Sequence, residues 1–248
     1  MFDAKKLLDQ FVGGQGGGQG GGQGGGLGGA LGGGGDFLRG AGGGVLAGGL
    51  AALLMGSKTG RKIGGEVLKL GGMAAVGALA HKAYSDWQAG KKAEPVAEAA
   101  KHPSVPMLPA PSGTPFNPTS EAGQQSLARH MLRAMIAAAK ADGHVDAQEQ
   151  SRIFAEMDKL PLSSEDKAFV MDELRAKLDV DAVAAAATTP EEAAELYAAS
   201  LLAIDVDNAA ERGYLGMLAA RLKLDDSLVA HLHGNVASAT GKAVPVAA

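Results

Sequence analysis

The chain has 248 residues, a net charge of −4 and no cysteine, so disulfide bonds, thiolate metal sites and cysteine nucleophiles are excluded. Of its 38 glycines, 32 fall in residues 1–118 and 6 in residues 119–248. Charge is divided in the same way, because the first part carries 11 basic and 7 acidic residues and the second carries 12 and 20. The acidic second half argues against nucleic acid as a partner, since phosphate binding needs clustered lysine and arginine.

The first residues of the chain predict a short amphipathic helix, suited to contact with a membrane surface. Its apolar residues share one helix face: Phe2, Leu7, Leu8, Phe11 and Val12. Residues 13–35 then contain 17 glycines among 23 positions. This composition buries too little side chain to offset the entropy of backbone ordering. Residues 1–38 are therefore predicted to be an amphipathic start followed by a Gly/Gln-rich flexible tether.

Residues 39–88 predict a membrane-associated helical hairpin. The 18 residues between Arg39 and Lys58 carry no charge, which is near the shortest length that spans a bilayer core. Small residues recur there at every fourth position and would let two helices pack closely in lipid: Gly40, Gly44, Gly48, Ala52 and Gly56. A second apolar stretch, residues 67–80, leads into an amphipathic end with Tyr84 and Trp87, of the kind found at membrane interfaces. The alternatives are a hairpin lying in the interface without crossing it, or a poorly folded Ala/Gly hairpin.

A linker is predicted over residues 89–118. This stretch holds seven of the ten prolines, together with alanine, serine and lysine. Proline blocks helix continuation and favours extended conformations. The start of a separate C-terminal domain is therefore expected near residue 118.

Residues 119–248 are predicted to form an acidic, all-α bundle of six or seven short helices. Apolar residues recur at helical spacing and are expected to face inward: Leu127, Met131, Met135, Ala138, Ile153, Phe154, Met157, Leu160, Phe169, Val170, Leu174 and Leu178. Helix starts are marked by capping residues: Asp146 with Glu149, Ser163 or Ser164, Thr189 before Pro190, Asn208 with Glu211, and Asp225 or Asp226. No segment alternates with period two for long enough to form a strand.

Two acidic turns in this domain are the candidate metal site. Each follows a helix of small residues and precedes a helix with a capping glutamate, which suggests two related helical units. Together they offer ligands for a divalent cation, Ca²⁺ or Mg²⁺: Asp142, His144, Asp146, Glu149, Asp205, Asp207 and Glu211. The calcium loop signature of EF-hands is absent. The alternative is that these acidic residues only cap helices.

The order of these parts is similar to that of a known family. A glycine-rich start, apolar stretches around MGSKTGRKIGG, a proline-rich linker, and the segments IAAAKADGHVDAQEQ and LLAIDVDNAAERGYL resemble the YebE family of bacterial inner membrane proteins. The C-terminal domain of that family is similar to the TerB fold of tellurite-resistance proteins. The resemblance implies an all-helical acidic domain held at the membrane and a link with metal or oxyanion stress, and it implies no known reaction.

Enzyme activity is not expected, because the chain has neither a nucleophile elbow nor histidines at convincing metal-ligand spacing. We therefore expect a non-enzymatic, membrane-associated protein of the bacterial inner membrane, with its acidic domain on the cytoplasmic side. Its expected partners are the membrane and another protein or a second copy, with weak binding of a divalent cation. The alternatives are a soluble stress-response or metal-buffering protein with a disordered glycine-rich N-terminus, and a metal-dependent hydrolase that uses the acidic turns.

Overall fold

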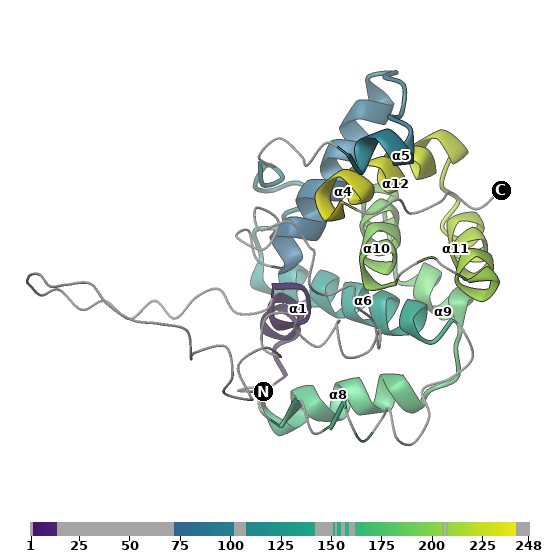
Figure 1. The fold of residues 1–248 in the computed structure, drawn as a ribbon. Helices are drawn as coiled ribbons and strands as arrows, with labels where there is room; N and C mark the ends of the chain where they lie inside the picture. The colour runs from purple at the N-terminus through teal and green to yellow at the C-terminus, as the bar shows by residue number, and fades with distance from the viewer. Residues whose placement is uncertain are drawn as a thin grey trace, which may run out of the picture.

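The computed structural model describes residues 2–13, 72–101, 108–141, 151, 153–154, 157–158, 162–204, 206 and 208–241. These residues form an all-helical fold whose elements are shown in Figure 1. The helices are α1 (Ala4–Gly13), α4 (Gly72–Gln88), α5 (Val96–Ala99), α6 (Glu121–Ala139), α8 (Ser164–Arg175), α9 (Val180–Ala185), α10 (Pro190–Ala203), α11 (Ala209–Arg221) and α12 (Asp226–Thr240). The described residues contain no strand, only an isolated bridge between Thr114 and Asn117.

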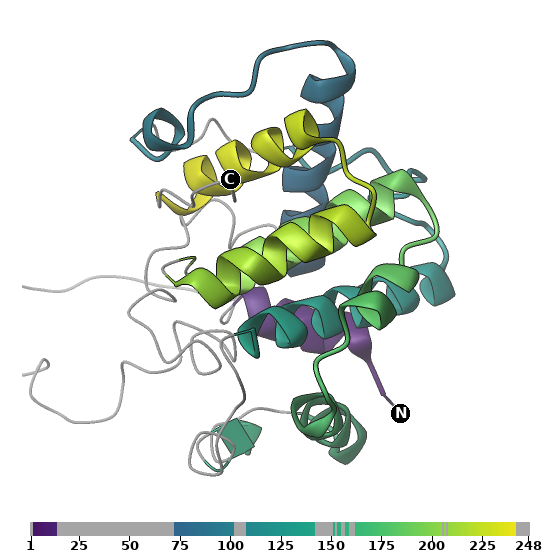
Figure 2. The same cartoon turned by 90° about the vertical axis from the view of Figure 1, so that its right-hand side faces the viewer.

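Helix α10 is the centre of the fold. It packs most extensively on α6 and also contacts α4, α12 and α11, so that neighbours surround it in both ribbon views (Figures 1 and 2). Every residue from Ala193 to Ala203 is buried. A helix that is covered on all sides must carry apolar or small side chains on every face. The alanines and leucines of this segment meet that requirement, and Glu195 is the one charged residue among them.

Helices α1 and α4 belong to the same core as the C-terminal helices. The apolar face of α1 carries Leu7 and Leu8, which are buried where this helix packs against α6 and α4. The carbonyl of Leu8 lies so close to Gly72 that a Cβ at Gly72 would be 2.5 Å from it, and Asp9 accepts a hydrogen bond from the Met73 amide at 3.2 Å. The face expected at a membrane surface is therefore covered by protein.

The structure also corrects the prediction that the second arm of the hairpin lies at a membrane. Residues 72–88 form one helix, α4, whose small and apolar residues are buried against α10 and α12. In the parts of the chain that the structure describes, no helix combines the length and apolar character needed to cross a membrane. The predicted packing residues Gly40, Gly44, Gly48, Ala52 and Gly56 lie outside those parts.

The described part of the proline-rich segment packs onto the core. Ala110 and Phe116 are buried, and the Asn117 side chain donates a hydrogen bond to the Ala110 carbonyl at 3.0 Å. The expected boundary near residue 118 thus does not separate two cores, because helices on both sides of it share one apolar cluster. Complementary apolar faces explain this: α1 and α4 cover surfaces of α6 and α10 that would otherwise meet water.

Four predicted capping signals of the C-terminal helices are confirmed, whereas Asp146 with Glu149 lies outside the described residues. Ser163, Thr189, Asn208 and Asp225 each accept a hydrogen bond from a backbone amide in the first turn of α8, α10, α11 and α12. Ser163 and Asn208 also form complete capping boxes. Because such caps connect residues two or three positions apart, a local sequence pattern is sufficient to identify them.

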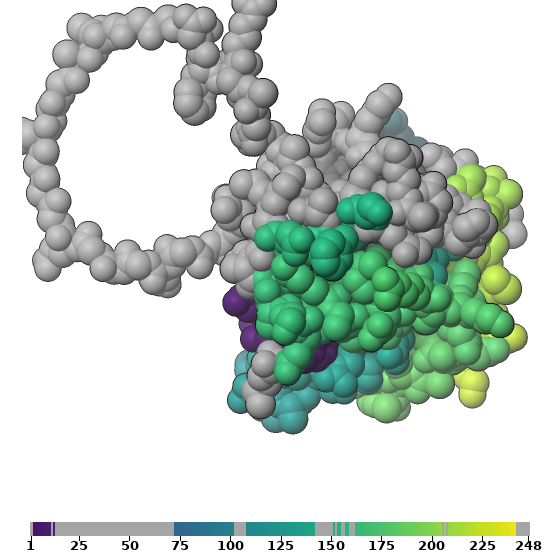
Figure 3. Space-filling view, turned by 90° about the horizontal axis from the view of Figure 1, so that it is seen from below, coloured from purple at the N-terminus to yellow at the C-terminus, as the bar shows by residue number. Residues whose placement is uncertain are grey.

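Helix α8 lies across the lower face of the molecule, and Figure 3 shows this face with part of α1 in purple at its edge. Arg133 of α6 forms an ion pair with Glu173 at 2.5 Å. The buried ammonium of Lys140 donates to the carbonyls of Glu173 and Ala176 at the end of α8. Phe2 contacts Phe169 in a tilted arrangement, with ring centroids 4.8 Å apart.

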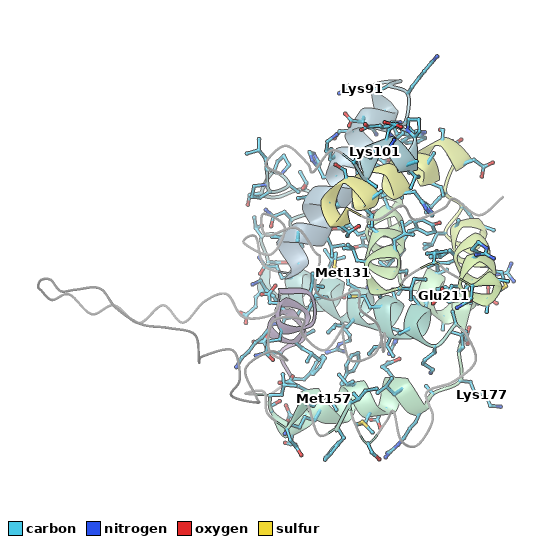
Figure 4. All side chains as sticks on the ribbon, in the orientation of Figure 1. Lys91, Lys101, Met131, Met157, Lys177 and Glu211 are labelled. Atoms are coloured by element: carbon cyan, nitrogen blue, oxygen red, sulfur yellow. The ribbon has the colours of Figure 1, made fainter. Side chains whose placement is uncertain are left out.

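Of the residues expected to face inward that the structure describes, two do not. Leu178 is 39% exposed, because α8 ends at Arg175 and the chain turns into α9, a helix that the sequence pattern did not predict. Phe154 is 46% exposed, whereas Ile153 and Met157 are buried as expected. Figure 4 shows Met157 close to α8.

Candidate functional site

An open groove of about 640 Å³ lies where four distant segments meet. It is formed by the end of α4, by α9 with the loop that follows it, by the first turn of α10, and by the turn between α11 and α12. Its volume falls within the range of about 300–1,000 Å³ that is usual for binding pockets. We consider this groove the candidate functional site.

One wall of the groove is aromatic. Tyr84 and Trp87, near the end of α4, have ring centroids 5.5 Å apart, and Phe116 supports Tyr84 at 5.7 Å. The indole N–H of Trp87 donates to the hydroxyl of Ser227 at 2.9 Å, which fixes the ring against the start of α12. Burial raises the pKa of Tyr84, and the negative charge of Glu191 adds to this effect, so its phenol is neutral at physiological pH. Trp87 is the only tryptophan of the chain.

The facing wall and floor are made of small side chains and hydroxyl groups. Four alanines line them: Ala184, Ala185, Ala187 and Ala193. Thr188 donates through both its amide and its hydroxyl to the Glu192 carboxylate, each at 2.7 Å. Thr189 caps α10. The loop is therefore held in place by its own hydrogen bonds, and the small side chains leave room for a ligand.

The charges at the rim are not equally available to a ligand. Arg221 is paired with Asp181 across the groove. Asp225 accepts hydrogen bonds from the hydroxyl and amide of Ser227, which lower its pKa and keep it ionised as a helix cap. Lys223 has an exposed side chain and no ion-pair partner among the described residues. Among the described residues of the rim, Lys223 therefore lacks an ion-pair partner and Asp225 is an ionised helix cap, both beside the aromatic wall.

Lys223 also has an unusual backbone conformation. Its φ is 55°, and it is the only residue other than glycine with a positive φ in the described part of the chain. A lysine in the left-handed region is uncommon and is strained relative to glycine. This conformation reverses the chain between α11 and α12 and places the lysine at the groove.

The predicted metal site is only partly within the described structure. Glu211 is the one candidate ligand there, and its carboxylate accepts the Asn208 amide at 3.4 Å in a capping box. Figure 4 labels it on α11. The remaining candidates, Asp142, His144, Asp146, Glu149, Asp205 and Asp207, lie outside the described residues. Within the described ranges, no group of three or more histidine or acidic residues is placed to hold a metal ion, and cation binding by the acidic turns stays a prediction.

Two buried polar features were not anticipated from the sequence. Tyr197 and His233 share a hydrogen bond of 2.9 Å between the phenol oxygen and Nε2, in the interior between α10 and α12. Glu195 is 0% exposed, and neither of its carboxylate oxygens has a hydrogen-bond partner among the residues that the structure describes. A signal for Glu195 does exist, because it is a single charge within the small and apolar run 193–204. The groove had no such signal, because its walls come from segments about 140 residues apart, as the Trp87–Ser227 bond shows.

Comparison with known proteins identifies relatives of this chain without assigning an activity. Residues 40–236 match a family model described as "Protein of unknown function (DUF533)". The chain is 34% identical over 96 residues to a protein of Yersinia enterocolitica described as "Uncharacterized protein in ampR 5'region", a match that covers 39% of this chain and 69% of that protein. No solved structure matches the chain. The finer likeness to YebE and TerB proteins stays a resemblance.

Proposed function

This chain belongs to the DUF533 family, and we propose that it is a non-enzymatic adaptor whose groove binds an apolar, acidic segment of a partner protein. The observation that supports this proposal most directly is the aromatic wall of Trp87 and Tyr84 beside Lys223, a lysine with no ion-pair partner in the described part of the chain. Tryptophan and tyrosine are enriched among the residues that dominate the energetics of protein interfaces.

The chemistry of the groove favours a polypeptide as its ligand. Trp87 and Tyr84 offer flat apolar surface to an aliphatic or proline side chain, as in other aromatic-lined peptide grooves. The alanine wall leaves width for an extended backbone. A carboxylate beside that anchor would be attracted by Lys223, whereas a basic segment would be repelled.

We propose further that the adaptor works at the bacterial inner membrane, with its helical domain on the cytoplasmic side. The support is the charge-free stretch of residues 40–57 and the resemblance to inner membrane proteins. The test is fractionation of cells that express the full chain. A Gly44→Leu, Gly48→Leu double variant should alter membrane assembly if the small-residue face packs helices in lipid. Recovery of the unaltered chain in the detergent-free supernatant would contradict the proposal.

The groove can be tested through the fluorescence of Trp87, because this single tryptophan forms its wall. The probes are tryptophan-free synthetic 12-residue peptides of two classes, leucine- and proline-containing sequences with either aspartate and glutamate or lysine and arginine. We expect a saturable change in emission with acidic peptides and a much weaker one with basic peptides.

The charge preference has a matched control. Lys223→Glu should reverse the preference between the two peptide classes. Lys6→Glu makes the same charge change at an exposed lysine of α1, a helix that does not line the groove, and should leave the preference unchanged. If no peptide of either class changes the emission, or if Lys223→Glu binds both classes as the unaltered protein does, the proposal is wrong.

A further inference from the structure

The carboxyl group of Glu195 is the least expected polar group of the core. It is fully buried, and within the described ranges of the chain both of its oxygens lack hydrogen-bond partners. Burying an ionised carboxylate without a partner is far more costly than burying the neutral acid. The stability of its surroundings therefore depends on whether this group holds a proton.

Glu195 lies at the contact between α10 and α4. A Cβ built on Gly77 of α4 would be 3.2 Å from Oε1 of Glu195 and 2.6 Å from the carbonyl oxygen of Phe116. The carboxyl is thus packed against helix backbone, in space that only a glycine leaves open. Water has no room to solvate a negative charge there unless the two helices separate.

The charges around Glu195 do not compensate it. Glu192 and Glu191 on its own helix act on it, and both are negative. The helices packed against α10 carry further titratable groups, and none of those described hydrogen-bonds to Glu195. They include His81 on α4, His130 on α6, His233 on α12 and Tyr214 on α11. Burial is the largest cause of the shift in the pKa of Glu195, and the carboxylates of Glu192 and Glu191 add to it, so this pKa is raised to about 9. The group is therefore neutral at pH 7.

The same two helices form facing parts of the groove. Pro190 and Ala193, in the first turn of α10, lie on one side, and Tyr84 and Trp87, at the end of α4, lie on the other. Tyr84 is two helical turns beyond Gly77 on α4. A separation of the helices at Gly77 and Glu195 therefore changes the width of the groove.

We propose that Glu195 is a proton-dependent contact between α4 and α10, which keeps the groove formed while its carboxyl is neutral and widens it when the proton is lost. No covalent change is involved, only the transfer of one proton to solvent. The effect on peptide affinity rests on the proposed function, whereas the movement of the helices does not.

The helix movement can be measured directly in the full-length protein. Because the chain has no cysteine, two introduced cysteines can carry spin labels at exposed sites on either side of the groove, Gln88→Cys on α4 and Ala182→Cys on α9. Double electron–electron resonance spectroscopy should show one narrow distribution of distances between the two labels at pH 7 and a second, longer distance at pH 10. The midpoint should lie near pH 9.

Two variants separate this effect from general alkaline loosening. Glu195→Gln keeps the shape of the side chain but cannot ionise, so it should retain the short distance at pH 10. Glu192→Gln should show the same change in distance as the unaltered protein. The midpoint of that change should move to lower pH, because a negative charge that acts on Glu195 is removed. Glu195→Met provides a second non-ionising variant in case the glutamine variant does not fold.

The outcomes are distinguishable from those of the peptide experiment. A distance that stays constant from pH 7 to pH 10 in folded, unaltered protein would overturn the proposal, as would an equal change in Glu195→Gln. If the distance changes as expected but no peptide binds at pH 7, the proton-dependent contact stands and the peptide function fails.

Discussion

Trp87 and Ser227 are joined by a hydrogen bond of 2.9 Å between the indole nitrogen and the hydroxyl oxygen, although 140 residues of sequence separate them. This bond connects the end of α4 to the start of α12 at the mouth of the groove. An N-terminal helix is thereby made part of a site whose remaining walls come from the C-terminal half of the chain.

The first prediction concerns this bond. Trp87→Phe keeps an aromatic ring but removes the N–H donor, and it should lower the free energy of unfolding by about 0.5–1.5 kcal/mol. Ser227→Ala removes the acceptor. Urea unfolding of both single variants and of the double variant measures their coupling. If the stability losses of the two single variants add up to that of the double variant, the bond does not stabilise the fold.

The second prediction concerns the close approach of α4 and α10. Gly77→Ala places a methyl group 2.6 Å from the Phe116 carbonyl, so it should destabilise the protein by about 1–3 kcal/mol. Gly213→Ala is the matched control, because Gly213 is exposed on α11 and a Cβ there meets nothing within 4 Å. That variant should gain about 0.5–1 kcal/mol from helix propensity. Thermal unfolding of the pair provides the comparison, and equal effects would contradict the packing described.

The third prediction is the pH dependence of stability caused by Glu195. Its pKa is about 9 in the folded protein against a usual value of 4.5, so the folded state holds a proton that the unfolded state releases between these values. The stabilisation is complete below pH 4.5 and is lost as pH rises toward 9. The contribution to the slope is at most about 1.4 kcal/mol per pH unit.

Glu195→Gln removes this contribution and should be more stable than the unaltered protein at pH 8, by a margin that increases up to pH 9. Urea unfolding at pH 6, 7, 8 and 9 measures it. If the free energy of unfolding depends on pH in the same way in both proteins, the Glu195 carboxylate has partners in solution that stabilise its charge.

The fourth prediction concerns the acidic turns. Calorimetric titration of the full chain with Ca²⁺, Mg²⁺, Mn²⁺ and Zn²⁺ should give saturable binding that an Asp142→Ala, Asp205→Ala double variant loses. Glu211→Ala tests the capping role separately, and should cost about 0.5–2 kcal/mol without added metal. An absence of heat with every ion would leave the acidic residues as helix caps.

Much of the C-terminal half could be predicted from sequence because its signals are local. The caps at Ser163, Thr189, Asn208 and Asp225 connect a side chain to a backbone amide two or three residues away, and the inward positions of Leu127, Met131 and Met135 follow helical periodicity. Local hydrogen bonds and periodic burial need no knowledge of the partner helix.

The helical character of α1 and α4 was also present in the sequence, but the environment of their apolar faces was not. A small-faced apolar helix satisfies its backbone in the same way in lipid or in a protein core, so periodicity cannot distinguish the two. The tertiary structure decided this point by placing Leu8 against Gly72, and Gly77 against Phe116 and Glu195. Contacts between distant segments also created the groove and isolated the Glu195 carboxyl from water, because burial depends on what packs around a residue and not on its neighbours in sequence.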